Sequence, residues 1–340
     1  MSLARAFLVC LIFSSLASSC VETDCVRSDT FECSDYGIVL SLASFRNKPY
    51  FIATGDAGRI VISEDNGLSY VERTLPTANN LAGAATNGNG TWVVVGGGVS
   101  GESFYSLDRG VSWSVATLPA SPSTRQDVTY GAGWFVSVGS GGQIYLSNDG
   151  MTWGATTSPT ANILRSVEYL NGQFVAGSDT GPTIIRSTNG LSWQLATTPP
   201  GAPVFDIASD PQGRLLVCGN AAVKASFSTT AGDSWVDATV SPAQNVFGAG
   251  YLNGRLICAG LTGNVFTSTD GGANWGLAAT GGTSINDVAY SATVAIGAGV
   301  GAGFTYRSTD AITWTVVTAP TGALFNRIGF LEERQLFLPP

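Results

Sequence analysis

Short apolar runs separated by Gly-, Asn- and Ser-rich turns recur along most of the chain. One unit shows the pattern clearly, with the runs DVTY (127–130), WFVSVG (134–139), QIYLS (143–147) and TWGATT (152–157). Runs of this length, rich in β-branched and aromatic residues and bounded by turn residues, are typical of β-strands. The pattern therefore predicts an all-β protein built from units of four strands.

A motif of the form Ser-x-Asp-(x)-Gly-x-x-Trp, which we call the box, follows the third strand of each unit. The leading serines of successive copies are 43, 41, 40, 41, 40 and 40 residues apart. Four strands in each unit of about 40 residues are typical of a β-propeller of four-stranded blades. The copies are SEDNGLSY (63–70), SLDRGVSW (106–113), SNDGMTW (147–153), STNGLSW (187–193), STTAGDSW (228–235), STDGGANW (268–275) and STDAITW (308–314).

The number of blades follows from counting the units. Seven complete units run from Ile38 to Thr318, and NRIGF (326–330) and QLFLP (335–339) then repeat the first two strands of a unit. We expect seven blades, with the extra pair protecting one edge of the ring; an eight-bladed ring with an incomplete last blade is the alternative. Residues 36–340 are expected to form a single propeller domain.

The box has a local physical explanation. Asp and Ser side chains can bond to backbone groups of the turn between strands three and four. Gly supplies the positive φ of the turn, and Trp covers apolar surface between neighbouring blades. We therefore expect the box aspartates to be structural and not catalytic. They are Asp65, Asp108, Asp149, Asp270 and Asp310.

The box resembles the Asp-box, or bacterial neuraminidase repeat, of sialidases, and the resemblance covers about Tyr36 to Thr318. Such boxes occur in sialidases, xyloglucanases, receptors and assembly factors, so the resemblance implies a fold and not an activity. The chain is also similar in size and layout to lipid-anchored propellers of the photosystem II assembly factor type, which implies a binding or assembly role.

The N-terminus has the layout of a secretory signal. Arg5 precedes an apolar run (6–13), and small residues lead to Cys20. The run is too short for a membrane span, which needs about 20 residues. The sequence before Cys20 resembles the lipobox of bacterial lipoproteins, with Ala17 where leucine is usual, and this implies a lipid on Cys20 after removal of residues 1–19. The alternative is an ordinary secretory signal. We expect an exported protein at the outer membrane, periplasm or cell surface.

The remaining cysteines form two groups. Cys25 and Cys33 lie close together in the polar segment 20–35 and are a candidate disulfide pair in an oxidising compartment. Cys218 and Cys258 lie inside the apolar runs LLVCG and LICAG, and we expect them to be small buried hydrophobic residues.

Composition excludes several functions. The chain has no histidine, which rules out Ser-His-Asp and Cys-His nucleophiles and His-ligated zinc. Its 16 Lys and Arg against 24 Asp and Glu give a net charge of −8, which disfavours nucleic-acid binding. No motif points to a cofactor or a metal, and we expect neither.

Candidate binding residues lie where each strand four leads into the next strand one, at the end of the propeller opposite the boxes. Polar side chains at the start of the innermost strand would surround the mouth of the central channel. The alternative is that the aspartates bind backbone N–H groups of the adjoining turn. The candidates are Asp127, Arg165, Asp206, Asp287 and Arg327.

A sialidase-like activity finds little support in the residues. Sialidases share an arginine triad, a Tyr–Glu pair and an Asp acid, and FRNKP (45–49) is only a partial echo of their first arginine motif. Glu168 and Tyr169 are neighbours on one strand, so they face opposite sides of the sheet. We therefore predict a non-catalytic, monomeric binding or scaffold module for a protein or glycan, with a sialidase-like glycoside hydrolase as the alternative.

Overall fold

The computed structural model describes the backbone of residues 25–27, 31–33, 38–40, 44–98, 101–120, 123–219, 225–240, 244–279, 282–299, 301, 303–320, 322 and 324–337. Side chains are described between Lys48 and Glu332. The expected signal peptide and Cys20 lie outside this part. The chain divides into two compact units, Met1–Arg46 with Gln335–Pro340, and Asn47–Arg334.

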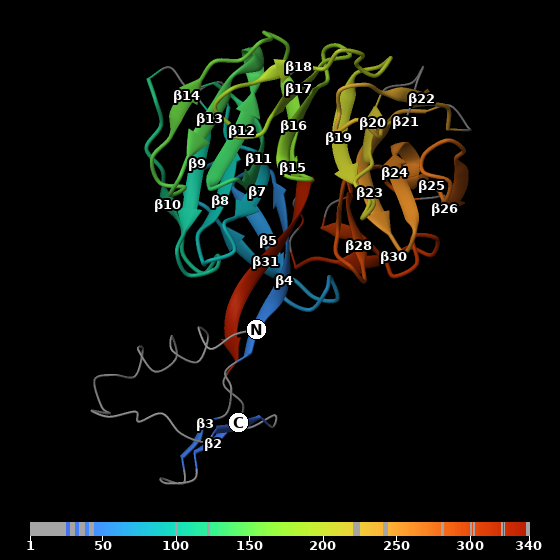
Figure 1. The fold of residues 1–340 in the computed structure, drawn as a ribbon. Coiled ribbons are helices and arrows are strands. Elements are labelled where there is room, and N and C mark those ends of the chain that lie inside the picture. Colours follow the sequence, from blue (N-terminus) through green and yellow to red (C-terminus); the bar gives the residue numbers. More distant parts are fainter. Residues whose placement is uncertain are drawn as a thin grey trace. The chain divides into compact units, whose positions relative to one another are not determined.

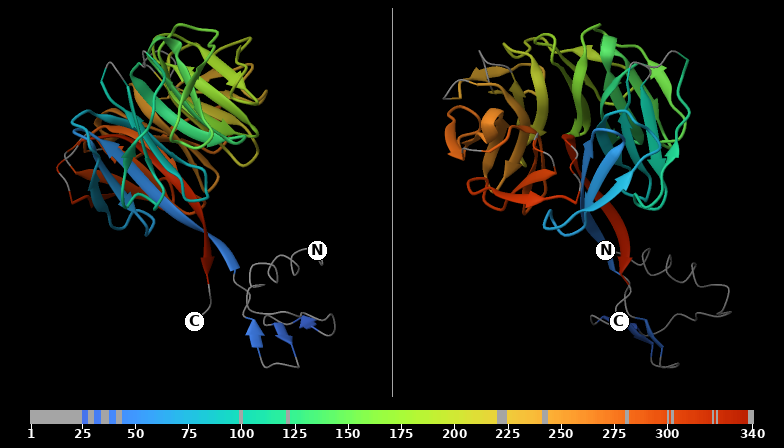
Figure 2. Two further views of the ribbon diagram at one scale, coloured as in Figure 1. Left: turned by 90° about the vertical axis from the view of Figure 1, so that its left-hand side faces the viewer. Right: turned by 180° about the vertical axis from the view of Figure 1, so that it is seen from behind.

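The larger unit is a seven-bladed β-propeller, in which seven sheets of four antiparallel strands form a ring (Figures 1 and 2). The all-β prediction and the preferred blade number are confirmed, and the eight-bladed alternative is wrong. Two short 3-10 helices, η1 (Ser140–Gly142) and η2 (Leu261–Gly263), follow strand two in blades 3 and 6. No described helix is long and apolar enough to cross a lipid bilayer.

Blades 2 to 7 each consist of four consecutive strands. Blade 2 contains β7 (Leu81–Thr86), β8 (Trp92–Gly96), β9 (Glu102–Ser106) and β10 (Ser114–Val115). Blade 3 contains β11 (Arg125–Gly131), β12 (Trp134–Gly139), β13 (Ile144–Ser147) and β14 (Gly154–Thr156). Blade 4 contains β15 (Leu164–Leu170), β16 (Gln173–Ser178), β17 (Ile184–Ser187) and β18 (Gln194–Leu195).

The other three of these blades follow the same plan. Blade 5 contains β19 (Val204–Ser209), β20 (Leu215–Gly219), β21 (Ala225–Ser228) and β22 (Val236–Ala238). Blade 6 contains β23 (Val246–Leu252), β24 (Arg255–Gly260), β25 (Val265–Ser268) and β26 (Gly276–Ala279). Blade 7 contains β27 (Ile285–Tyr290), β28 (Ala295–Gly299), β29 (Phe304–Ser308) and β30 (Thr315–Thr318).

Blade 1 is completed by the C-terminal strand. Its order is β31 (Phe325–Phe337), β4 (Ser44–Gly55), β5 (Arg59–Ser63) and β6 (Val71–Thr74). The first unit was expected to begin at Ile38, but β3 (Ile38–Leu40) belongs to a three-stranded sheet with β1 (Cys25–Arg27) and β2 (Phe31–Cys33). The expected strands NRIGF and QLFLP are one continuous strand, β31. β31 therefore supplies the innermost strand of blade 1 in place of the expected strand at Ile38. Its pairing with β4 leaves no open sheet edge inside the ring, which is the physical reason for this arrangement.

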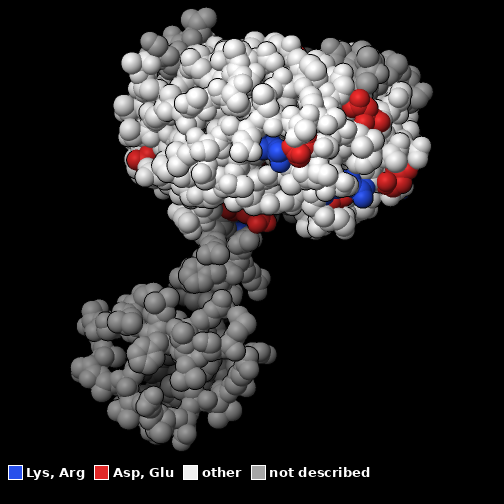
Figure 3. Space-filling view, turned by 45° about the horizontal axis from the view of Figure 1, so that its top comes forward, with Lys and Arg blue, Asp and Glu red and all other residues white. Residues whose placement is uncertain are grey.

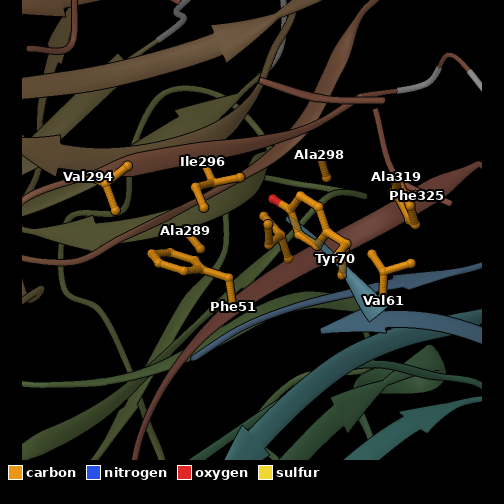
Figure 4. Packing of buried hydrophobic residues seen from close by; sticks show 11 residues of the cluster. Phe51, Val61, Tyr70, Ala289, Val294, Ile296, Ala298, Ala319 and Phe325 are labelled. Carbon is orange, nitrogen blue, oxygen red and sulfur yellow. The ribbon is translucent and has the colours of Figure 1, made fainter. Parts of the chain in front are cut away.

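An apolar cluster seals the junction between blades 7 and 1 (Figure 4). Phe51 and Val61 from blade 1 pack with Phe325 of the closing strand and with Ile296 of β28. Tyr70, which replaces Trp in the first box, joins the same cluster. Ring closure therefore buries apolar side chains from both ends of the propeller sequence.

The boxes form hydrogen-bonded turns. In the third box, Asp149 Oδ1 accepts hydrogen bonds from the backbone N–H groups of Met151 (2.8 Å) and Thr152 (2.9 Å), while Ser147 Oγ accepts one from Gly150 N (2.8 Å). Trp153 Nε1 donates to the Gly150 carbonyl at 3.2 Å. The carboxylate is used inside its own turn, which confirms the structural role expected for the box aspartates.

A disulfide joins neighbouring blades. Cys218 on β20 and Cys258 on β24 are fully buried and bonded to each other, with their Cα atoms 5.9 Å apart. Burial was predicted correctly, but the expectation of two plain hydrophobic residues is wrong, because strands two of blades 5 and 6 place the two thiols in contact. Cys25 and Cys33 are partners in the β1–β2 register. Their side chains lie outside the described part, so that disulfide stays a prediction.

Charged side chains are sparse on the surface, in keeping with a chain of only 12% charged residues. Figure 3 shows one face on which a few Lys, Arg, Asp and Glu side chains, some of them in contact with a side chain of opposite charge, lie among uncharged ones.

Candidate functional site

A repeated irregularity in strand one positions the site. In blade 3, Arg125 pairs with Gly139 and Asp127 with Val138, so Gln126 is an extra residue that forms a β-bulge. The same skip occurs in blades 2 and 4 to 7. The residues after the bulges, with their counterpart on β31, form a ring at the propeller axis. They are Gly83, Asp127, Ser166, Asp206, Gly248, Asp287 and Arg327.

The aspartates of this ring connect neighbouring blades. Asp127 Oδ2 accepts a hydrogen bond from Val167 N of blade 4 at 3.0 Å. Asp206 Oδ2 accepts one from Ala249 N of blade 6 at 2.7 Å. Asp287 Oδ2 likewise accepts one from Ile328 N of blade 1 at 2.9 Å. Hydrogen bonds from backbone N–H groups to these aspartates were the alternative that we expected if the aspartates do not bind a ligand.

Small residues alternate with the aspartates, and two of them are glycines because a Cβ atom there would collide with the next blade. A Cβ atom on Gly83 would lie 2.6 Å from Asp127 Oδ1, and one on Gly248 would lie 2.7 Å from the backbone nitrogen of Val288. Ser166, between two aspartate-bearing blades, donates from its hydroxyl to Asp206 Oδ1 at 3.2 Å. The ring therefore accepts an aspartate only where the preceding blade carries a small residue.

Arg327 brings one guanidinium to this ring from the closing strand. Its Nη1 lies 3.4 Å from Asp206 Oδ1 and 3.5 Å from Asp287 Oδ1. Its Nη2 donates to the carbonyl oxygens of Arg165 (2.7 Å) and Phe205 (3.3 Å). The side chain is buried, so one cation holds blades 4, 5 and 7 to blade 1.

Four of the five candidate residues thus come together, and Arg165 does not join them with its side chain. Its guanidinium lies 3.5 Å from Asp179 Oδ2 and stacks over the Phe205 ring at 5.0 Å. It contributes only its carbonyl oxygen to the cluster around Arg327.

A cavity of about 580 Å³ adjoins the ring. Asp127, Asp206, Asp287 and Arg327 line one part of it, and the turns between strands one and two line the other. Those turns lie at the same end as the boxes, since Asn253 in one of them donates to the carbonyl oxygen of Thr309 beside a box. The cavity therefore extends toward the end of the propeller that carries the boxes. From the sequence we expected a ligand at the end opposite the boxes.

Glu168 is a cavity residue that the sequence analysis did not select. It lines the cavity, while Tyr169 points to the other face of the sheet and packs on Phe174 at 4.7 Å between ring centroids. The expected separation of the two side chains is confirmed. Glu168 lies two residues after Ser166, so strand alternation alone places it on the ring's face of β15.

Burial and crowding shift the acidic groups. Burial raises the pKa of Asp127 to about 6, against the opposing charge of Arg327. Burial, with the negative charges of its neighbours, raises the pKa of Glu168 and that of Asp206 well above their ordinary values. Burial opposes the charge on Arg327, but the surrounding carboxylates raise its pKa above the ordinary value. Because carboxyl groups outnumber the cation, the cluster retains protons close to neutral pH.

No group of three or more Cys, Asp or Glu side chains in the described part of the chain is placed to hold a metal ion. The carboxylates of the ring instead face backbone N–H groups and Arg327. The expectation of no metal and no cofactor stays a prediction.

Comparisons with known proteins identify the fold. No family model matches the chain, and no curated protein sequence matches it. A structure of YCF48 bound to D1 peptide is 19% identical over 75% of this chain and 88% of that one, with a TM-score of 0.57. YCF48 from Cyanidioschyzon merolae is 15% identical over 79% and 91%, with a TM-score of 0.59. Apo AztD from Citrobacter koseri is 8% identical over 86% and 100%, also with a TM-score of 0.59. At these identities the likeness shows a shared propeller fold alone.

Proposed function

We propose that this protein is a non-catalytic binding propeller that takes a cationic side chain of a protein partner into its central cavity. The observation that carries the proposal is the charge balance of the cavity. Glu168 lines it together with the three ring aspartates, while Arg327 is already shared between two carboxylates and two carbonyls. Asp210 also lines the cavity, but it is paired with Arg214 and accepts hydrogen bonds from Gln212 N and Arg214 N. A lysine or arginine of a partner would favour the ionised form of the ring and Glu168 carboxyl groups, displace the protons that they retain, and pair with the resulting carboxylates. The volume of the cavity, about 580 Å³, also falls within the roughly 300–1,000 Å³ of small-ligand sites.

The fold supports a protein partner in general terms. One structurally similar propeller, YCF48, has a solved structure with a bound D1 peptide. Blades of this architecture can therefore present a peptide-binding surface, and the present chain is proposed to do so with its own residues.

The geometry favours binding over a sialidase-like hydrolysis. A carboxylated substrate would need free arginines, but Arg327 is fully engaged and Arg165 is paired with Asp179. Tyr169 lies on the opposite face of its strand from Glu168, so the two cannot act as a nucleophile pair. Among the described residues, the cavity therefore offers neither free arginines nor a Tyr–Glu nucleophile pair.

Binding can be tested by isothermal titration with a pentalysine peptide at pH 7 and low salt. Glu168→Gln should weaken binding at least tenfold, because it removes the cavity carboxylate without changing its shape. Glu64→Gln, on the exposed surface, is the matched control and should bind as wild type does. Equal affinities for all three proteins would refute the cavity as the site. Turnover of a fluorogenic sialoside or glycoside by wild type, lost in Asp206→Asn, would replace binding with catalysis.

We also propose that the protein is exported and anchored by lipid at Cys20. The buried disulfide between Cys218 and Cys258 supports folding in an oxidising compartment. Metabolic labelling with palmitate should mark the wild type and not Cys20→Ala. Unlabelled wild-type protein in the culture medium would favour the ordinary secretory signal.

A further inference from the structure

A groove between blades 6 and 7 is separate from the central cavity and has a volume of about 540 Å³. Trp275, Leu277 and Ile312 provide its apolar surface, and Arg255 and Asp270 lie among its polar residues. Asp270 and Trp275 belong to the sixth box and Ile312 to the seventh, whereas Arg255 and Leu277 lie outside the boxes, and the proposed binding at the central cavity uses none of them. Other polar residues of the groove are Thr267, Thr269 and Asn274.

The groove lies beside an irregular outer strand. Between blades 2 and 3, Thr117 N donates to Met151 O (2.8 Å) and Trp153 N to Thr117 O (3.0 Å), so that strand four is tied to the next box. In blade 6, Val265 pairs with Ala279 and Phe266 with Leu277, which leaves Ala278 as a bulge.

Among the described residues, no backbone hydrogen bond ties β26 to the box of blade 7. The groove therefore lies where the outer strand of blade 6 carries a bulge and has no backbone hydrogen bond to the box of blade 7 among the described residues.

The apolar side of the groove is partly exposed, with Trp275 packed against a buried apolar cluster and Leu277 exposed to solvent. Trp275 is half-buried, whereas Trp153 and Trp193 are at most 8% exposed. Its Nε1 donates to the Gly272 carbonyl at 2.9 Å, which fixes the orientation of the indole ring. Leu277 is 41% exposed, so an aromatic face and an aliphatic side chain are available together.

The polar side offers a donor and an acceptor. The Arg255 side chain has no hydrogen bond or ion pair with any described residue, so its guanidinium N–H donors are available to a ligand. The Asp270 carboxylate accepts hydrogen bonds from Asn274 N (2.9 Å) and Asn274 Nδ2 (2.7 Å). These bonds lower the pKa of Asp270 to about 2, so it is ionised and still has free lone pairs.

We propose that this groove binds a saccharide. The C–H face of a pyranose ring would stack on Trp275, and adjacent hydroxyl groups would accept from Arg255 and donate to Asp270. Arg255 and Asp270 carry one charge of each sign, so the groove gives phosphate and other anions no net attraction, and the short apolar surface gives little area to a helix or a long peptide. A ligand with alternating apolar faces and hydroxyl groups matches what the groove presents.

The test uses the purified exported chain and two probes, cellohexaose and chitohexaose, whose β-1,4-linked rings carry flat apolar faces. Isothermal titration should show binding of at least one probe. Arg255→Gln should weaken it at least tenfold. Arg109→Gln removes an exposed arginine at the second box and is the matched control, which should not change affinity.

A second variant guards against misfolding. Leu277→Asp changes an exposed position, so the blade should still fold while a charge occupies the apolar surface. Circular dichroism and melting temperature would confirm folding. Binding that is unaffected by Arg255→Gln and Leu277→Asp would overturn the proposal, as would no binding of either hexasaccharide by wild type. Glu168→Gln should leave saccharide affinity unchanged, which separates this site from the central cavity.

Discussion

Arg327 Nη1 lies 3.4 Å from Asp206 Oδ1, although the two residues are 121 positions apart in the chain. One belongs to the strand that completes blade 1, and the other begins strand one of blade 5. Closure of the ring and the electrostatics of the central cavity therefore depend on the same ion pair.

Replacing Arg327 by Met should lower the free energy of unfolding by about 3–5 kcal/mol, because it leaves buried carboxylates without their cation. Urea denaturation followed by tryptophan fluorescence measures the effect. Arg109→Met, at an exposed position, should change stability by less than about 0.5 kcal/mol. A loss below about 1 kcal/mol for Arg327→Met would contradict this expectation. It would show that the carboxyl groups can bind protons in place of the cation with little loss of folding free energy.

The central cluster should make the protein more stable in mild acid than at neutral pH. The pKa of Asp127 is about 6 in the folded state, raised by burial, against about 3.9 in an unfolded chain. The folded state thus binds more protons between these values, and unfolding free energy falls as pH rises from about 4 to 6. The raised pKa values of Asp206 and Glu168 act in the same direction and extend the fall to higher pH.

The boxes have the opposite dependence at lower pH. Hydrogen bonds from Ser112 lower the pKa of Asp108 to about 2, so its contribution is lost as pH falls from about 4 to 2. Stability should therefore be greatest near pH 4–5. Urea titrations from pH 3 to 8 test this profile. Glu168→Gln should raise stability at pH 7 and flatten the slope above pH 5; an unchanged slope would exclude Glu168 from the titrating cluster.

The box glycine should be less replaceable than a turn glycine with the same backbone conformation. Gly150 has φ +77° and a Cβ there would lie 2.7 Å from Val93 Cγ2, whereas Gly133 has φ +84° and nothing within 4 Å. Gly133→Ala should cost about 1 kcal/mol from the left-handed conformation alone. Gly150→Ala should cost about 1–3 kcal/mol more because of overpacking. Thermal unfolding compares them, and equal losses would show that blade packing adapts to the methyl group.

Arg125 is a fully buried cation whose guanidinium nitrogens have no hydrogen-bond partner among the described residues, and it stacks between Tyr145 (4.1 Å) and Trp153 (4.7 Å). Burial lowers its pKa to about 10. The equivalent position of blade 4 is Leu164, so the fold accepts an apolar residue there. Arg125→Met should therefore raise stability by about 1–2 kcal/mol. Arg125→Ala, which leaves a cavity, is the contrasting variant; destabilisation by both to the same extent would show that the ring contacts outweigh desolvation.

The double variant Cys218→Ala with Cys258→Ala should lose about 2–4 kcal/mol, because the bond closes a long loop between blades. Chemical denaturation of the variant, and of wild type with and without reductant, measures the effect. Both cysteines of the disulfide are fully buried, so a reductant should reach the bond only after the two blades open locally. Wild type and variant of equal stability without reductant would contradict a stabilising bond.

The repeats in the sequence allowed the positions of four of the five residues proposed for the central site to be predicted correctly. Asp127, Asp206 and Asp287 follow the same bulge in their blades and Arg327 is their counterpart on β31, so aligning the repeats placed them together. Arg165 occupies the bulge itself, and its side chain turns toward Asp179. The alignment did not distinguish these two neighbouring positions.

By itself, the sequence determined the blade, the number of boxes and the hydrogen-bonded turn within each box, because all of these depend on contacts inside a unit of about 40 residues. Only the tertiary structure decided which strand completes blade 1, that Cys218 and Cys258 are bonded, and that Arg327 neutralises aspartates of distant blades. Those contacts exist only when the ring has closed, since closure joins residues that no local pattern relates.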